Sequence, residues 1–93
     1  MSKEYYRKQI ADLRKDIIDL REDKKKRADR KRKDIESLSN RIKYANSSAQ
    51  KASYRKRKID VREGYKRDVK RIKDKIERIK DRVNSLRDRI KRM

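Results

Sequence analysis

The sequence predicts an all-α protein that folds as a long antiparallel helical hairpin, a two-helix coiled coil. Three observations support this prediction: a strict heptad pattern of apolar residues, very few helix-breaking residues, and one turn-forming stretch at mid-chain. The 93 residues include no proline and a single glycine, Gly64, so little in the backbone interrupts a helix. No stretch alternates apolar and polar residues with a period of two, and strands are therefore not expected.

The clearest heptads lie in the C-terminal third of the chain. Apolar side chains there recur at alternating spacings of four and three residues, and nearly every residue between them is charged. This spacing places one narrow apolar stripe along a helix, as in coiled coils, so the helix needs a partner helix. The stripe comprises Tyr65, Val69, Ile72, Ile76, Ile79, Val83, Leu86, Ile90 and Met93.

A first helix is expected over residues 3–45, with Ser2 placed to cap its start. Its apolar stripe weakens over residues 21–33, which contain nine basic residues, three acidic residues and one alanine. Lys24, Ala28 and Lys31 continue the heptad there with one irregular step, so the helix is predicted to be unbroken. On either side, the apolar heptad positions are Tyr6, Ile10, Leu13, Ile17, Leu20, Ile35, Leu38, Ile42 and Ala45, and the same spacing continues beyond this helix at Ala49 and Ala52.

A turn is expected over residues 46–50, followed by a second helix over residues 51–92, so that residues 1–93 form one domain. Asn46, Ser47 and Ser48 form the least charged stretch, and small polar residues favour turns and helix caps. If the chain folds back near residue 48, the numbers of facing residues sum to about 96. Tyr6 then faces Ile90, and Ile10, Leu13, Ile17, Leu20 and Ile35 face Leu86, Val83, Ile79, Ile76 and Val61.

Two helices alone bury little apolar surface. We therefore expect self-association, with two hairpins forming a four-helix assembly, and Tyr5 and Ile18 lie beside the stripe where a second contact would form. Two other architectures fit the pattern. One is a single unbroken helix that dimerises, and the other is a three-helix bundle with turns near Lys33 and Gly64.

Charge is the strongest indication of function. The chain has 35 lysine and arginine residues against 16 aspartate and glutamate residues, a net charge of +19. Such an excess repels itself and favours a polyanionic partner. Residues 21–33 hold an excess of six positive charges, and residues 55–75 an excess of seven. The ends of the hairpin keep more acids, and we expect Asp12, Asp16 and Asp19 to pair with Arg78, Lys80 and Arg82.

The two basic stretches are predicted to bind the backbone of nucleic acid with little sequence preference. Lysine and arginine neutralise phosphates, and arginine also holds a phosphate in a fork. The cations point in nearly all directions around the helix, which suits backbone contact better than a base-reading face. DNA and RNA both fit, in a nucleoid, in genome packaging or in a virion. The expected binding residues are Lys24, Lys25, Lys26, Arg27, Arg30, Lys31, Arg32, Lys33, Arg55, Lys56, Arg57, Lys58, Arg67, Lys70 and Arg71.

The composition argues against catalysis and metal binding. Cysteine and histidine do not occur, which removes thiolate and imidazole ligands and the usual general base. No glycine-rich phosphate loop or nucleophile motif occurs either, so we expect a non-enzymatic protein without cofactor or metal. No apolar run approaches the roughly 20 residues of a membrane span, and the charged start does not resemble a signal peptide. A cytoplasmic, nucleoid or virion-interior location is expected.

A helical adaptor or chaperone for a larger acidic or helical protein is the alternative function. The length, the mid-chain turn and the C-terminal heptads resemble those of the small WxG helical-hairpin proteins of specialised secretion systems. The bend has no Trp-x-Gly, and no tyrosine is followed four residues later by an acid. The sequence therefore does not assign the chain to that family, and the resemblance only motivates the alternative.

Overall fold

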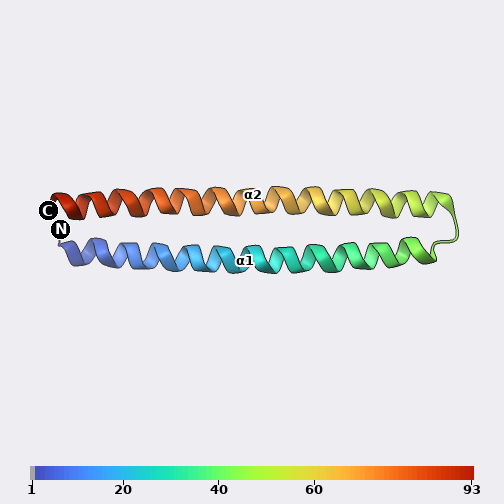
Figure 1. Ribbon diagram of the computed structural model, residues 1–93, viewed down its shortest axis with the longest axis horizontal. Coiled ribbons are helices and arrows are strands. Elements are labelled where there is room, and N and C mark those ends of the chain that lie inside the picture. The colour runs from blue at the N-terminus through green and yellow to red at the C-terminus, as the bar shows by residue number, and fades with distance from the viewer. Residues whose placement is uncertain (1) are drawn as a thin grey trace. The chain divides into compact units, whose positions relative to one another are not determined.

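The computed structural model describes residues 2–93, and in that range it contains two α-helices and no strand. They are α1 (Lys3–Tyr44) and α2 (Ser48–Arg92), which confirm the predicted all-α helical hairpin (Figure 1). Helix α1 continues through Lys33 and α2 continues through Gly64, so neither the single unbroken helix nor the three-helix bundle forms. Neither helix has an apolar stretch long enough to cross a membrane.

Side-chain caps define the start of each helix. The backbone N–H of Tyr5 donates to Oγ of Ser2 at 3.3 Å, and the backbone N–H of Gln50 donates to Oγ of Ser47 at 3.2 Å. Oε1 of Gln50 in turn accepts from the backbone N–H of Asn46 at 3.3 Å. This exchange closely resembles a capping box, and it explains why α2 begins at Ser48 rather than at the expected residue 51.

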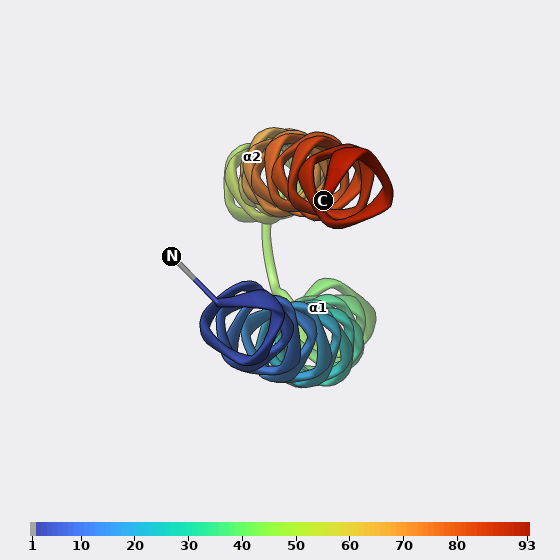
Figure 2. The same ribbon diagram turned by 90° about the vertical axis from the view of Figure 1, so that its left-hand side faces the viewer.

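The hairpin divides into two compact units. The terminal unit comprises Met1–Asp23 and Arg71–Met93, and the central unit comprises Lys24–Lys70, which includes the turn. Within each unit a segment of α1 runs antiparallel to a segment of α2 (Figure 1). In the terminal unit, the beginning of α1 and the end of α2 lie side by side (Figure 2).

Apolar side chains pack between the helices of the terminal unit. Leu86 has no exposed surface, and Ile10, Ile17 and Val83 are buried. These residues are ones that a register of about 96 brings together, so the predicted register is confirmed in this unit. Burial of each such side chain stabilises the fold by about 1.5–3 kcal/mol. The cluster around Ile10, Val83 and Leu86 also includes Tyr6, Leu13, Ile79 and Ile90.

The seam of the central unit, meaning the line along which its two helices meet, mixes apolar with charged side chains. Leu38 is the one buried residue among those described there. Ala49 and Ala52, expected on the apolar stripe, are exposed, because α2 starts anew at the Ser47 cap and turns a different face to α1. The half-buried positions of α2 follow their own heptad, which comprises Lys51, Tyr54, Lys58, Val61 and Tyr65.

Candidate nucleic-acid interface

The central unit holds most of the net charge. Its 47 residues include 19 basic and 6 acidic residues, which gives a net charge of +13. The terminal unit has almost the same length, 46 residues, with 16 basic and 10 acidic residues and a net charge of +6. Six carboxylates cannot neutralise 19 cations, so the central unit keeps a large positive excess whichever ion pairs form.

Fourteen of the fifteen predicted binding residues lie in the central unit, and Arg71 lies in the terminal unit. Four of the fourteen, Lys24, Arg27, Lys31 and Lys58, are half-buried at the seam rather than free on the surface. The other ten are exposed to solvent, where a large ligand can reach them. They are Lys25, Lys26, Arg30, Arg32, Lys33, Arg55, Lys56, Arg57, Arg67 and Lys70.

Arg27 and Lys31 of α1 contact Tyr65 and Asp68 of α2 across the seam. Nε of Arg27 donates to Oδ2 of Asp68 at 2.7 Å. Nζ of Lys31 lies 4.4 Å from the centre of the Tyr65 ring, and the guanidinium carbon of Arg27 lies 5.9 Å from it. Both distances are within cation–π range. Arg27 and Lys31 therefore help to hold the two helices together and are less free to contact a ligand than their exposed neighbours.

Ion pairs neutralise few of the basic residues. Among residues 2–93, Arg27 pairs with Asp68 between the helices, and Arg32 pairs with Asp29 within α1.

The predicted ion pairing at the ends of the hairpin is wrong. In the described range, no ion pair within 4 Å joins Asp12, Asp16 or Asp19 to Arg78, Lys80 or Arg82. Apolar residues fill the terminal seam and leave these flanking side chains in solvent. In the central unit, where charged residues also occupy the seam, Arg27 and Asp68 do pair between the helices.

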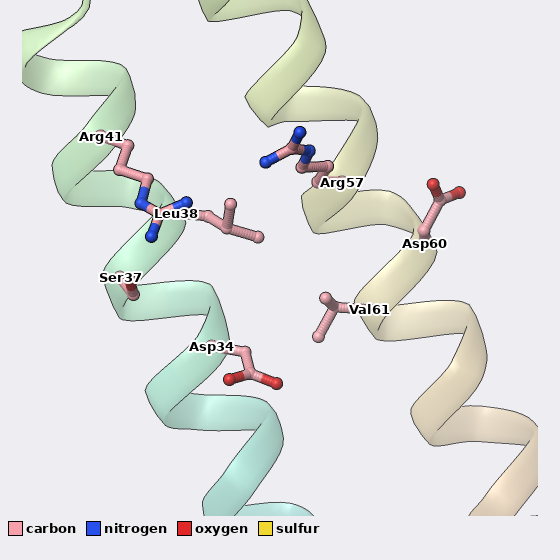
Figure 3. Close-up of a pocket in the computed structure, with 7 residues that line it drawn as sticks. All are labelled: Asp34, Ser37, Leu38, Arg41, Arg57, Asp60 and Val61. Carbon is pink, nitrogen blue, oxygen red and sulfur yellow. The ribbon is translucent and has the colours of Figure 1, made fainter.

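A second group of cations gathers around Tyr54. The guanidinium carbons of Arg41 on α1 and Arg57 on α2 lie 6.0 and 5.6 Å from the centre of its ring. Both arginines line a groove of ≈ 370 Å³ between the helices (Figure 3). Arg41 is missing from the predicted set because it lies outside both basic stretches. The sequence signal that could have identified it is the register, which places residue 41 opposite residues 54–57. The groove is also lined by Asp34, Ser37, Leu38, Asp60 and Val61.

The part of the chain that the structure describes contains no group of three or more acidic side chains placed to hold a metal ion. No protein-family model matches the chain, and no curated protein or solved structure is significantly similar to it.

Proposed function

We propose that this chain is a non-enzymatic protein that binds the backbone of nucleic acid with little sequence preference. The observation that supports this function is the net charge of +13 on the central unit, where ten of the predicted binding residues are exposed. Cations at this density release condensed counterions when they neutralise phosphates, which makes binding favourable and strongly salt-dependent. Compaction or coating of a genome, in a nucleoid or a virion, would use such binding.

The arrangement of the cations favours phosphates over base edges. Lys26, Arg30 and Lys33 are exposed and share one face of α1, because they are spaced four and three residues apart. A row of this kind can follow successive phosphates of a strand, a contact that positions a protein but reads no sequence. The rings of Tyr54 and Tyr65 are already covered in part by cations, so they are poorly placed to stack on bases.

A salt titration tests this function. The protein is freed of nucleic acid and titrated by fluorescence anisotropy with labelled duplexes of unrelated sequence and with single-stranded RNA, between about 50 and 200 mM salt. We expect the logarithm of the affinity to fall linearly with the logarithm of the salt concentration, by about 0.9 per phosphate neutralised on duplex DNA. Unrelated duplexes should give the same line.

Two results would contradict the proposal. One is no binding at the lowest salt concentration. The other is tighter binding to polyglutamate of equal charge than to nucleic acid, which would favour an acidic protein partner and the adaptor function.

Self-association of hairpins is the second part of the proposal. Ile18 is 64% exposed and lies off the terminal seam, so a four-helix assembly would cover apolar surface that one hairpin leaves in water. Sedimentation velocity at high salt, which screens repulsion between the cationic chains, should show a dimer for the unmodified protein. Ile18→Glu should sediment as a monomer, and a monomeric unmodified protein would refute this part.

A further inference from the structure

We propose that Arg41 and Arg57, held against the ring of Tyr54, form a subsite for one phosphodiester group of the nucleic-acid backbone. This inference rests on the proposed function and identifies one contact within it. Arg57 belongs to a basic stretch of the sequence, whereas Arg41 is the only arginine between residues 33 and 55. The subsite is therefore defined by the fold and not by local charge density.

The ring of Tyr54 positions the two guanidinium groups. Tyr54 is half-buried on α2, and the guanidinium carbons of Arg41 and Arg57 lie 6.0 and 5.6 Å from the ring centre. An aromatic face attracts a guanidinium without neutralising its charge. A planar guanidinium at a ring also keeps N–H groups available at its edge, in the fork that matches phosphate oxygens. Tyr54 can thus fix the arginines while leaving them able to bind an anion.

The charges around the ring favour an anion at this place. Two positive groups that approach the same ring repel each other, and a phosphate shared between them would remove that repulsion. Neither arginine forms an ion pair within 4 Å among residues 2–93, although Asp34 and Asp60 line the same groove. In Figure 3 the side chain of Arg57 points toward α1, whereas the carboxylate of Asp60 points away from it. Asp34 precedes Arg41 by seven residues, about two helical turns, so its carboxylate is separated from the guanidinium group of Arg41 along α1.

The two arginines belong to different helices, so the subsite exists only when α1 and α2 are paired in the central unit. One phosphate held by both would bridge the helices. Loss of either arginine should therefore remove most of the contact, and loss of the second should add little. This non-additivity distinguishes a shared subsite from two independent surface cations.

The variants Arg41→Gln, Arg57→Gln and their combination test the subsite, with Arg62→Gln as the control. Arg62 is exposed on α2 in the central unit and its substitution removes the same charge. Within residues 2–93, the cations at the Tyr54 ring are Arg41 and Arg57, and Arg62 is not among them. At about 0.1 M salt we expect each subsite variant to bind duplex DNA about tenfold more weakly than the unmodified protein, with the salt slope reduced by about 0.9. The double variant should lose less than the product of the single losses, and the control should lose about twofold.

A second measurement does not depend on the folding of the variants. In the unmodified ¹⁵N-labelled protein, the Nε–H signals of Arg41 and Arg57 should shift together on titration with dimethyl phosphate. The Nε–H signal of Arg62 should stay in place under the same conditions. Acetate at equal concentration should shift the first two signals less.

The outcomes separate the subsite from the proposed function. If the unmodified protein binds DNA but Arg41→Gln behaves like Arg62→Gln, and dimethyl phosphate does not shift the two signals, the subsite is refuted and the proposed function stands. If the unmodified protein binds no nucleic acid at about 50 mM salt, the proposed function fails and the subsite for nucleic acid fails with it. If acetate shifts the signals as strongly as dimethyl phosphate, the assignment to phosphate is overturned.

Discussion

In the terminal unit the two helices meet almost entirely through apolar side chains, whereas in the central unit aliphatic side chains share the seam with arginine, lysine, tyrosine and aspartate. The terminal unit buries Ile10, Ile17, Val83 and Leu86, and the central unit buries Leu38 alone among the described residues. The net charge is +6 in the first and +13 in the second. The heptad period thus pairs the helices in both units, but the two units differ in the side chains at the seam and in net charge.

Under the proposed function, this difference separates the residues that stabilise the hairpin from the residues that would bind nucleic acid. Apolar burial supplies most of the favourable free energy of packing, and it is concentrated where the charge is low. Partly exposed ion pairs and cation–π contacts are each worth about 1 kcal/mol or less, and they occur where like charges repel most. A polyanion that neutralises the central unit should therefore also stabilise it, because binding to the folded state stabilises that state.

The largest effect expected is on DNA affinity, and it differs between the units. The triple variant Lys26→Gln, Arg30→Gln and Lys33→Gln removes three exposed cations from one face of α1 in the central unit. We expect the affinity at about 0.1 M salt to fall by about 10²- to 10³-fold and the salt slope to fall by about 2 to 3. Lys24 and Arg27 are better left unchanged, because they are half-buried at the seam.

The matched control removes the same charge from the terminal unit. Lys73→Gln, Lys80→Gln and Arg87→Gln also change two lysines and one arginine, and these residues share one exposed face of α2 at heptad spacing. We expect an affinity loss below about tenfold, since only long-range attraction is reduced. Equal losses in the two triple variants would show that net charge alone, and not its location, determines binding.

The next largest effect is on stability. Leu86→Ala should lower the free energy of unfolding by about 3 kcal/mol or more, because the fully buried side chain leaves a cavity in the terminal cluster. Leu38→Ala should cost about 2 kcal/mol or less, since a groove already lies beside Leu38. Urea unfolding followed by circular dichroism measures both, with Ile59→Ala, at a side chain that is 53% exposed, as a control within about 0.5 kcal/mol of the unmodified protein. A larger cost for Leu38→Ala would reverse the comparison.

A smaller change in stability, of opposite sign, is expected from a substitution at Gly64. A Cβ atom there would meet Nη2 of Arg27 at 3.7 Å and Nη2 of Arg67 at 3.9 Å, which are ordinary contacts. The backbone at Gly64 is helical with negative φ, so Gly64→Ala should stabilise the central unit by about 1 kcal/mol. Thermal unfolding gives the change, and Ala52→Gly, an exposed site in the same helix, should shift stability the other way. Destabilisation by Gly64→Ala would mean that the seam cannot accept a methyl group.

The smallest effect concerns the contact between Arg27 and Asp68. These side chains are 23% and 43% exposed, so we expect a coupling energy of about 0.5 to 1 kcal/mol. A double-mutant cycle with Arg27→Gln and Asp68→Asn isolates this pair from the other contacts of each residue. The coupling should weaken at high salt. A coupling energy of zero at low salt would show that this ion pair does not stabilise the central unit.

The fold was predictable because the terminal heptads contain isoleucine, leucine and valine at nearly every contact position. Such a stripe specifies the helix, its face and the register of about 96. The central seam was harder to predict, since Lys51 and Lys58 occupy contact positions that an apolar pattern does not reveal. The register of about 96 places Arg27 opposite Asp68 and Arg41 opposite Tyr54. Whether these side chains touch also depends on the rotation of each helix about its axis, which sequence spacing leaves undetermined. The ten exposed cations of the predicted set could be located from the sequence alone, because they lie in its two basic stretches.

Hydrogen exchange of backbone amides, measured along the chain with and without a DNA duplex, tests the division between the units most directly. Without DNA, amides of the terminal unit should exchange more slowly than those of the central unit, because local opening is easier where fewer apolar contacts are buried. With DNA bound, protection should rise over residues 24–70 and change little over residues 3–20 and 75–90. Equal protection along both helices, or a rise confined to the terminal unit, would contradict the account.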